Sequence, residues 1–156
     1  MSRAISNKSQ TPQQQAVTPL IGSLLRLPHE VIMGRMLATL NANGFDVTYT
    51  ELAVFLYPGP DGRRPIDLAR QCNMTRQAMN YVLSGLETRG YILRQVGPSA
   101  TARVVCLTDR GWLLIAQIRK CVTEIEEEWA AHLGARRFIE LRKTLQELAM
   151  WLGKIN

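Results

Sequence analysis

The stretch PIDLARQCNMTRQAMNYVLSGLETRGYI, residues 65–92, decides the fold of this chain of 156 residues. It predicts two helices joined by a tight turn. The first, residues 65–72, has apolar side chains at steps of three. Asn73 follows at the point of reversal, because an asparagine tolerates a left-handed backbone. Thr75 then caps a second helix, which Gly90 ends.

The second helix has two chemically different faces. Apolar residues at helical spacing form a core face, which consists of Met79, Val82, Leu83 and Leu86. The opposite face is polar and consists of Arg76, Gln77, Asn80, Tyr81 and Ser84. It has no acidic residue before Glu87, whereas most solvated helix faces mix both signs of charge. A carboxylate here would repel a phosphate backbone, so this face is suited to bind DNA in its major groove.

Each polar side chain of this face has a chemical role that fits DNA. Gln77 and Asn80 can read adenine edges, and Arg76 can read guanine or hold a phosphate. Tyr81 and Ser84 can bond phosphate or contact sugar. The alternative interpretation is an ordinary solvated surface.

After Gly90 the period of the sequence changes from 3.6 to 2. Residues 91–96 and 101–107 are short strand-type runs, and GPSA between them is a turn, so we expect a two-stranded hairpin. Helix, turn, helix and hairpin in this order predict a winged helix-turn-helix within a mainly α fold with a small β-hairpin wing. Arg94 and Arg103 lie in this wing, where we expect contacts with the DNA backbone or minor groove.

The distribution of charge agrees with this placement. The chain has a formal net charge of +6. Residues 60–111 carry eight Lys/Arg and four Asp/Glu, a net of +4, whereas residues 1–59 and 112–156 each have a net of +1. Most of the positive excess therefore lies in the predicted winged unit, which indicates an anionic partner.

The flanking segments are predicted to be helical and to mediate assembly. Thr18 caps a first helix that Pro28 should kink or restart, and Thr48 and Glu51 have the form of a capping box. Thr108 caps a long helix that ends near residue 133. The last helix has a heptad seam of Phe138, Leu141, Leu145, Leu148 and Leu152. This seam favours a dimer interface over an intramolecular core.

These patterns divide the chain into four segments. Residues 1–17 are a polar arm expected to be disordered. Residues 18–44 hold the N-terminal helices, expected to take part in dimerisation. Residues 45–111 form the winged DNA-binding domain, and residues 112–156 form the C-terminal dimerisation helices.

The segments PIDLARQCNMT, LETRGYI and VVCLTDRG together resemble the MarR (multiple antibiotic resistance regulator) family of winged-helix transcription factors. The likeness extends in helix order from about Thr18 to Lys154. The resemblance implies a homodimer formed by the terminal helices, which binds a pseudo-palindromic operator in double-stranded DNA. It also implies release by a small ligand or an oxidant, as expected for a repressor.

A small apolar or aromatic effector would fit where the first helix, the helix through residues 52–57 and the long helix meet. The candidate lining is Met33, Met36, Leu37, Phe55 and Trp112. Methionines and aromatic residues adapt to varied apolar molecules, yet the same residues would also serve as core.

Cysteine chemistry offers an alternative form of regulation. Cys106 is predicted to point outward from its strand, and Cys121 follows the cationic Lys120 on the predicted long helix. Either thiol could act as an oxidant sensor in place of a ligand. A buried Cys72 is expected to be inert.

Other function classes receive less support from the sequence. There is no nucleophile–base pair, phosphate loop or metal-ligand cluster, so we expect no enzyme activity, metal or cofactor. No apolar run has the length of a membrane span and there is no signal peptide, so we expect a cytoplasmic protein. A winged-helix module that binds proteins instead of DNA would need an exposed apolar recognition face, and this face is polar.

Overall fold

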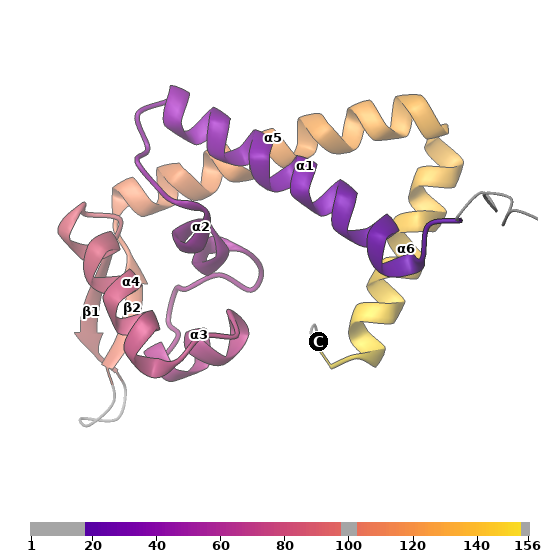
Figure 1. The fold of residues 1–156 in the computed structure, drawn as a ribbon. Coiled ribbons are helices and arrows are strands. Elements are labelled where there is room, and N and C mark those ends of the chain that lie inside the picture. The colour runs from indigo at the N-terminus through magenta and orange to yellow at the C-terminus, as the bar shows by residue number, and fades with distance from the viewer. Residues whose placement is uncertain (1–17, 98–102, 154–156) are drawn as a thin grey trace, which may run out of the picture.

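The computed structural model describes residues 18–97 and 103–153 (Figure 1). The predicted arm and the tip of the hairpin lie outside the described residues. The elements in chain order are α1 (Ile21–Ala42), α2 (Tyr49–Phe55), α3 (Pro65–Gln71), α4 (Arg76–Thr88), β1 (Ile92–Val96), β2 (Arg103–Leu107), α5 (Asp109–Leu133) and α6 (Ala135–Trp151). This is the predicted mainly helical fold with a hairpin wing.

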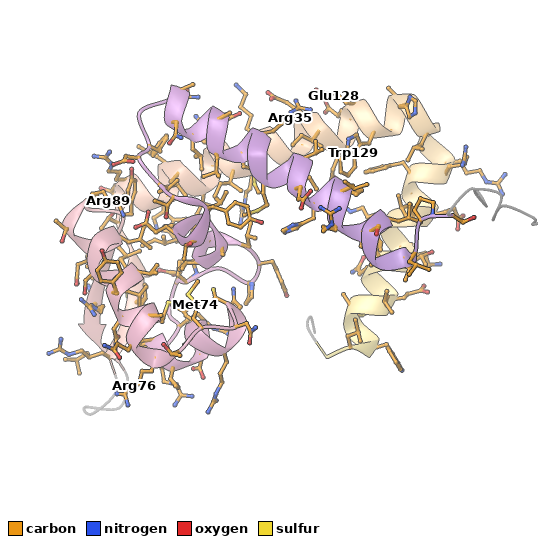
Figure 2. The ribbon with its side chains drawn as sticks, in the orientation of Figure 1. Arg35, Met74, Arg76, Arg89, Glu128 and Trp129 are labelled. Atoms are coloured by element: carbon orange, nitrogen blue, oxygen red, sulfur yellow. The ribbon has the colours of Figure 1, made fainter. Side chains whose placement is uncertain are left out.

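Two long helices support a small winged unit. α1 packs along α5, and the unit of α2, α3, α4 and the hairpin lies below one end of α5 (Figure 1). α6 leaves the other end of α5 and stands apart from the winged unit. Arg35 of α1 donates to Glu128 of α5 at 2.8 Å, which ties the two long helices on their outer side (Figure 2).

One apolar core joins the long helices to the winged unit. The fully buried side chains include Met33, Met36, Leu40, Leu52, Leu68, Met79, Leu83, Leu86, Tyr91, Ile92, Leu114 and Ile125. The four predicted core residues of α4 are all buried, and so are Ile118 and Cys121 of α5. Because every element except α6 contributes buried side chains, α1 to α5 and the hairpin form one packed body.

The local signals for caps and turns are confirmed. The Thr48–Glu51 capping box is formed in both directions. Thr75 Oγ1 accepts a hydrogen bond from the Ala78 amide at 3.1 Å. Asn73 has φ 52, the left-handed conformation expected at the reversal between α3 and α4. These bonds fix where the second helix of the helix-turn-helix begins.

The two sequence motifs LETRGY and LTDRG meet in space. Thr108 Oγ1 donates to the Gly90 carbonyl at 2.6 Å and also caps α5 by accepting from the Gly111 amide at 3.1 Å. The Arg110 guanidinium lies 4.9 Å from the centre of the Tyr91 ring. The motif pair therefore forms the joint that sets α5 against the end of α4.

The wing is wider than the predicted hairpin. β1 and β2 pair antiparallel, with Leu93 opposite Cys106 and Arg94 opposite Val105. The loop before α3 adds a short bridge, because the Val105 amide donates to the Arg63 carbonyl and the Gly62 amide donates to the Val105 carbonyl, each at 2.8 Å. The loop between α2 and α3 is therefore bonded directly to the wing.

The predicted start of the first helix at Thr18 and its predicted restart at Pro28 were wrong. Leu20, not Thr18, is the N-cap of α1, and α1 continues through Pro28 as one helix. A proline inside a helix leaves the carbonyl four residues earlier without its usual partner. Here that carbonyl belongs to Leu24 on an exposed stretch of α1, where water can replace the lost hydrogen bond.

Within the described residues, no helix is long and apolar enough to cross a membrane.

Candidate nucleic-acid interface

The outward face of α4 is free of protein contacts over most of its length. Arg76, Gln77, Tyr81 and Ser84 are exposed, and Asn80 is half-buried. Tyr81 is 84% exposed, although a tyrosine of a soluble domain usually buries much of its ring. Arg76 lies at the edge of the winged unit that faces away from α1 and α5 (Figure 2). The predicted recognition residues therefore form one accessible surface on one helix.

The acidic residue at the end of this face is neutralised by the wing. Glu87 Oε2 accepts from Nε of Arg94 at 2.9 Å and from Nη2 at 2.6 Å, and its other oxygen accepts from the Arg94 amide at 3.0 Å. These bonds from Arg94 lower the pKa of Glu87. Arg94 Nη2 also donates to Ser84 Oγ at 3.1 Å. Arg94 thus ties β1 to α4, and the sequence alone did not reveal this pairing.

A basic concavity lies between α3, α4 and the wing. Its volume is about 380 Å³, and its lining is Arg64, Pro65, Ile66, Arg76, Asn80, Arg94 and Arg103. The Asp67 carboxylate accepts two hydrogen bonds from Arg64, one from Nε at 2.7 Å and one from Nη2 at 3.1 Å. These bonds lower the pKa of Asp67. The sequence analysis did not single out Arg64, because nothing local shows that it faces the recognition helix.

A buried ion pair anchors the other end of α4. Arg89, the C-cap of α4, donates to the carboxylate of Glu51, which is only 8% exposed. Burial raises the pKa of Glu51, but hydrogen bonds from the Thr48 amide, the Arg89 side chain and the Thr48 hydroxyl outweigh it and the pKa is lowered overall. Arg89 also donates to the Asp46 carbonyl at 2.9 Å. The angle of α4 is thereby fixed by α2.

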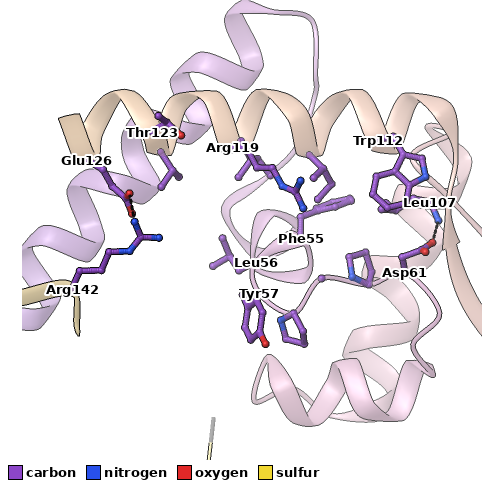
Figure 3. Close-up of a pocket in the computed structure, with 16 residues that line it drawn as sticks. Phe55, Leu56, Tyr57, Asp61, Leu107, Trp112, Arg119, Thr123, Glu126 and Arg142 are labelled. Atoms are coloured by element: carbon purple, nitrogen blue, oxygen red, sulfur yellow. Dashed lines mark hydrogen bonds and ion pairs between the residues drawn. The ribbon is translucent and has the colours of Figure 1, made fainter. Parts of the chain in front are cut away.

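An open cleft lies between the loop that follows α2, one side of α5 and Arg142 of α6. It has a volume of about 540 Å³ and is lined by Phe55, Leu56, Tyr57, Pro58, Gly59, Pro60, Asp61, Leu107, Trp112, Ile115, Ile118, Arg119, Val122, Thr123, Glu126 and Arg142 (Figure 3). Two of the five predicted lining residues, Phe55 and Trp112, contribute to its walls. Trp112 is 49% exposed and faces this space.

The other three predicted lining residues lie elsewhere. Met33 and Met36 are buried in the core, and Leu37 packs against that core from a half-buried position. The reason is that α1 packs directly on α5, so the α1 side chains that point inward fill the space between the two helices. The cleft opens instead below α5, at the loop of residues 57–61, where the sequence analysis predicts only a turn.

The cleft combines apolar walls with separated charges. Arg142 of α6 donates to Glu126 at 3.2 Å, so these two groups neutralise each other at one end. Arg119 extends from α5 toward Phe55 (Figure 3), and no carboxylate among the described residues forms an ion pair with it. A small molecule with an aromatic body and one negative charge would match this lining.

The three cysteines differ in exposure. Cys121 is buried, with its sulfur 3.5 Å from Thr39 Oγ1 at the contact of α1 and α5. Cys106 is half-buried on β2, and its sulfur lies 3.8 Å from Gln95 Oε1. Cys72, which was predicted to be buried, is half-buried, and this partial burial raises the pKa of its thiol. Among the described residues, no group of three or more His, Cys, Asp or Glu side chains is placed to hold a metal ion.

The terminal helices present apolar side chains to the outside. None of the α6 residues is buried, and the exposed large apolar side chains of α1 and α6 are Ile21, Leu24, Leu25, Leu27, Val31, Ile139, Leu141, Leu145, Leu148, Met150 and Trp151. Leu152, just after α6, is 54% exposed, and Phe138 is half-buried. The predicted heptad seam thus lies on the surface of the described chain.

Taken with this interface, the fold defines the chain as a winged helix-turn-helix protein. By sequence, neither a protein-family profile nor a curated protein matches it. Solved structures do match over most of its length. Rv2887, a MarR family protein of Mycobacterium tuberculosis in complex with p-aminosalicylic acid, is 30% identical with a TM-score of 0.61, and the match covers 85% of this chain and 99% of that one. The chain belongs to the MarR family of transcriptional regulators.

Two further structures support the same fold. A complex of Rv2887 with DNA is 26% identical with a TM-score of 0.63, over 84% of this chain and 98% of that chain. A MarR family transcriptional regulator from a Rhodococcus species has a TM-score of 0.63 at 20% identity, over 83% of this chain and 93% of that chain. This last likeness is one of fold.

Proposed function

We propose that this regulator binds a pseudo-palindromic operator as a homodimer, acts as a repressor and is released by a small aromatic acid. The observation that carries the DNA-binding part is the exposed polar face of α4, whose one acidic neighbour, Glu87, is neutralised by Arg94. A helix with a cationic and amide surface beside a basic wing fits a DNA major groove. Rv2887, which is 26% identical to this chain, was solved in complex with DNA, and this supports DNA binding by this chain.

Base reading is assigned to the first turns of α4. Gln77 and Asn80 lie on its outward side, and residues near the start of a recognition helix reach deepest toward base edges. Tyr81 and Ser84 lie further along the helix, where contacts with sugar and phosphate are expected. Arg103 of the wing contacts the backbone or minor groove.

Dimerisation is assigned to α1 and α6. Their apolar side chains are exposed in one copy of the chain, and a heptad seam on a terminal helix is typical of a helix-to-helix interface. Covering both helices would remove a large apolar surface from water. Two-fold symmetry would then present two copies of α4 to two half-sites of one operator.

The effector class follows from the cleft lined by Phe55, Trp112 and Arg119. Aromatic walls favour an aromatic body, and the Arg119 guanidinium favours a carboxylate. Rv2887 was solved in complex with salicylic acid and also in complex with p-aminosalicylic acid. The salicylic acid complex is 29% identical to this chain. We therefore assign this chain to aromatic carboxylates of similar size.

The DNA-binding part is tested by selection of bound duplexes from random sequence with the purified protein. We expect enrichment of an inverted repeat whose half-sites are about one helical turn apart. A variant with Arg76, Gln77 and Asn80 all changed to Ala is the control, and it should enrich no consensus while it keeps its fold by circular dichroism. Failure of the wild-type protein to enrich any sequence would show that the proposed function is wrong.

The effector part is tested by release of the protein from its selected operator. Salicylate should release it, and salicylamide, the neutral compound of the same shape, should act roughly tenfold more weakly because it lacks the charge that pairs with Arg119. Arg119→Gln should remove the difference between the two compounds. Equal potency on the wild-type protein, or no release by any aromatic acid, would contradict the assignment.

A further inference from the structure

We propose that Arg64, Arg76 and Arg103 form a seat for one phosphodiester group of the operator, on the strand that passes between the recognition helix and the wing. This inference rests on the proposed DNA binding and adds a contact from α3, a helix that carries none of the predicted DNA-binding residues. It also assigns Arg76 to the DNA backbone, where the sequence left guanine and phosphate open.

The basic concavity lies between the parts of the molecule that are expected to enter neighbouring grooves of DNA. Its lining comes from the start of α3, the first two turns of α4 and both strands of the wing. When α4 lies in a major groove and the wing lies at the neighbouring minor groove, the strand that separates the two grooves runs between them. The arginines of the concavity therefore face sugar-phosphate backbone, whereas Asn80, which also lines it, keeps its assignment to base edges.

The concavity also has an excess of positive charge. Four guanidinium groups line it, and two of them are bound to carboxylates, Arg64 to Asp67 and Arg94 to Glu87. Among the described residues no carboxylate forms an ion pair with Arg76. Four cations against two anions leave an excess of positive charge in a space of about 380 Å³, and an anionic phosphate group relieves that repulsion.

The carboxylates also fix how the guanidiniums are presented. Asp67 holds Arg64 through two hydrogen bonds, so the arginine is oriented before DNA arrives. Preorganised guanidinium groups lose less side-chain entropy on binding phosphate. Arg94 is bound to Glu87 through both its side chain and its amide, and we assign it as a positioning residue that holds the wing at the rim of the seat.

The inference separates the roles of neighbouring residues on α4. Arg76 lines the concavity together with Arg64, whereas Gln77 does not and lies on the side of α4 near Thr50 and Tyr81. Loss of Arg76 should therefore weaken binding to all duplexes alike. Loss of Gln77 should change which base is preferred.

Arg64→Ala tests the seat, and Arg70→Ala is the matched control. Both residues lie at α3 and both are within ion-pair distance of Asp67, but Arg70 is 76% exposed and does not line the concavity. Operator affinity is measured at several salt concentrations for each variant. We expect Arg64→Ala to reduce the slope of log affinity against log salt by about 0.9 per half-site, with the selected consensus unchanged. Arg70→Ala should leave the slope near the wild-type value.

Three results would overturn the inference. The first is an equal change of the salt slope in Arg64→Ala and Arg70→Ala, which would indicate that any positive charge on this surface attracts DNA without a specific phosphate contact. The second is a changed consensus in Arg76→Ala, which would assign that residue to a base. The third is tight binding of inorganic phosphate to the wild-type protein without DNA, lost in Arg64→Ala, which would indicate a site for a free anion.

A conservative variant guards against misfolding. Arg64→Lys keeps the charge but cannot donate in a bidentate manner, so we expect it to keep the wild-type slope with lower affinity. If the wild-type protein selects an operator and Arg64→Ala and Arg64→Lys both behave like wild type, the seat is wrong and the proposed function stands. If the wild-type protein selects no DNA, the proposed function fails and the seat fails with it.

Discussion

Gly111 and the Tyr91 carbonyl oxygen are so close that a Cβ atom placed on Gly111 would lie 2.1 Å from that oxygen. The Leu107 side chain would be 2.9 Å from the same Cβ. Gly111 therefore allows the first turn of α5 to rest on the backbone that follows α4, and this explains why the motif ends in glycine.

Gly111→Ala is expected to lower the free energy of unfolding by about 2–3 kcal/mol, because the methyl group must displace backbone and not a flexible side chain. Thermal or denaturant unfolding measures the change. Gly34→Ala is the control, since Gly34 is also inside a helix and nothing lies within 4 Å of its added Cβ. It should be neutral or stabilising by up to about 1 kcal/mol. Equal effects of the two substitutions on stability would contradict the close approach of Gly111 to the Tyr91 carbonyl.

The Glu51–Arg89 pair should make stability depend on pH. The pKa of Glu51 is lowered in the folded chain, so its contribution is present above about pH 4.3, the ordinary pKa of a glutamate, and is lost as pH falls toward the folded value. Glu51→Gln should cost about 1–3 kcal/mol at pH 7 and flatten the loss of stability at acid pH.

Asp46→Asn is the control for this pair, measured by denaturant unfolding over a series of pH values. Asp46 lies 3.8 Å from the same arginine, but its side chain is 86% exposed, so the change should stay below about 0.5 kcal/mol. An acid profile of Glu51→Gln that coincides with the wild-type profile would argue against the pair.

Leu145→Asp combined with Leu148→Asp should abolish the proposed dimer, because each charge would have to be buried in an apolar seam. Sedimentation or light scattering reads the mass. Gln146→Asp, on another side of the same helix, should leave the dimer intact. A doubly substituted protein that remains a dimer would place the interface elsewhere.

Gln77→Ala should blur the operator consensus at one base pair in each half-site, at a cost of about 1–3 kcal/mol per contact, with the salt slope nearly unchanged. Arg103→Ala should instead lower the affinity and the slope with the consensus kept. DNA selection and salt titrations of both variants distinguish reading of bases from contact with backbone. An unchanged consensus in Gln77→Ala would show that Gln77 does not contact a base.

The winged unit could be predicted from sequence because its signals are local. Thr75, Asn73 and Gly90 each act within a few residues, and the core face of α4 follows from spacing alone. The restart predicted at Pro28 was wrong, because a missing amide does not end a helix where the exposed carbonyl can turn to water.

The ion pairs and the cleft depend on residues far apart in the chain. Arg89 meets Glu51 across 38 residues and Arg35 meets Glu128 across 93, so no spacing rule reveals either pair. The predicted effector lining includes Phe55 and Trp112, which do lie in the cleft wall, and Met33 and Met36, which do not. Packing of α1 on α5 buries both and leaves the space at the loop of residues 57–61.

That loop gives the cleft a direct mechanical connection to the wing. Asp61, in the cleft wall, accepts a hydrogen bond from the Leu107 amide at 2.8 Å, and the next two residues bond to Val105 of the same strand. Gln71, at the end of α3, donates to the Leu56 carbonyl at 3.3 Å on the other side of the loop. The loop of residues 57–61 therefore connects the wall of the cleft to β2 through direct hydrogen bonds, along a route that passes through neither α1 nor α5.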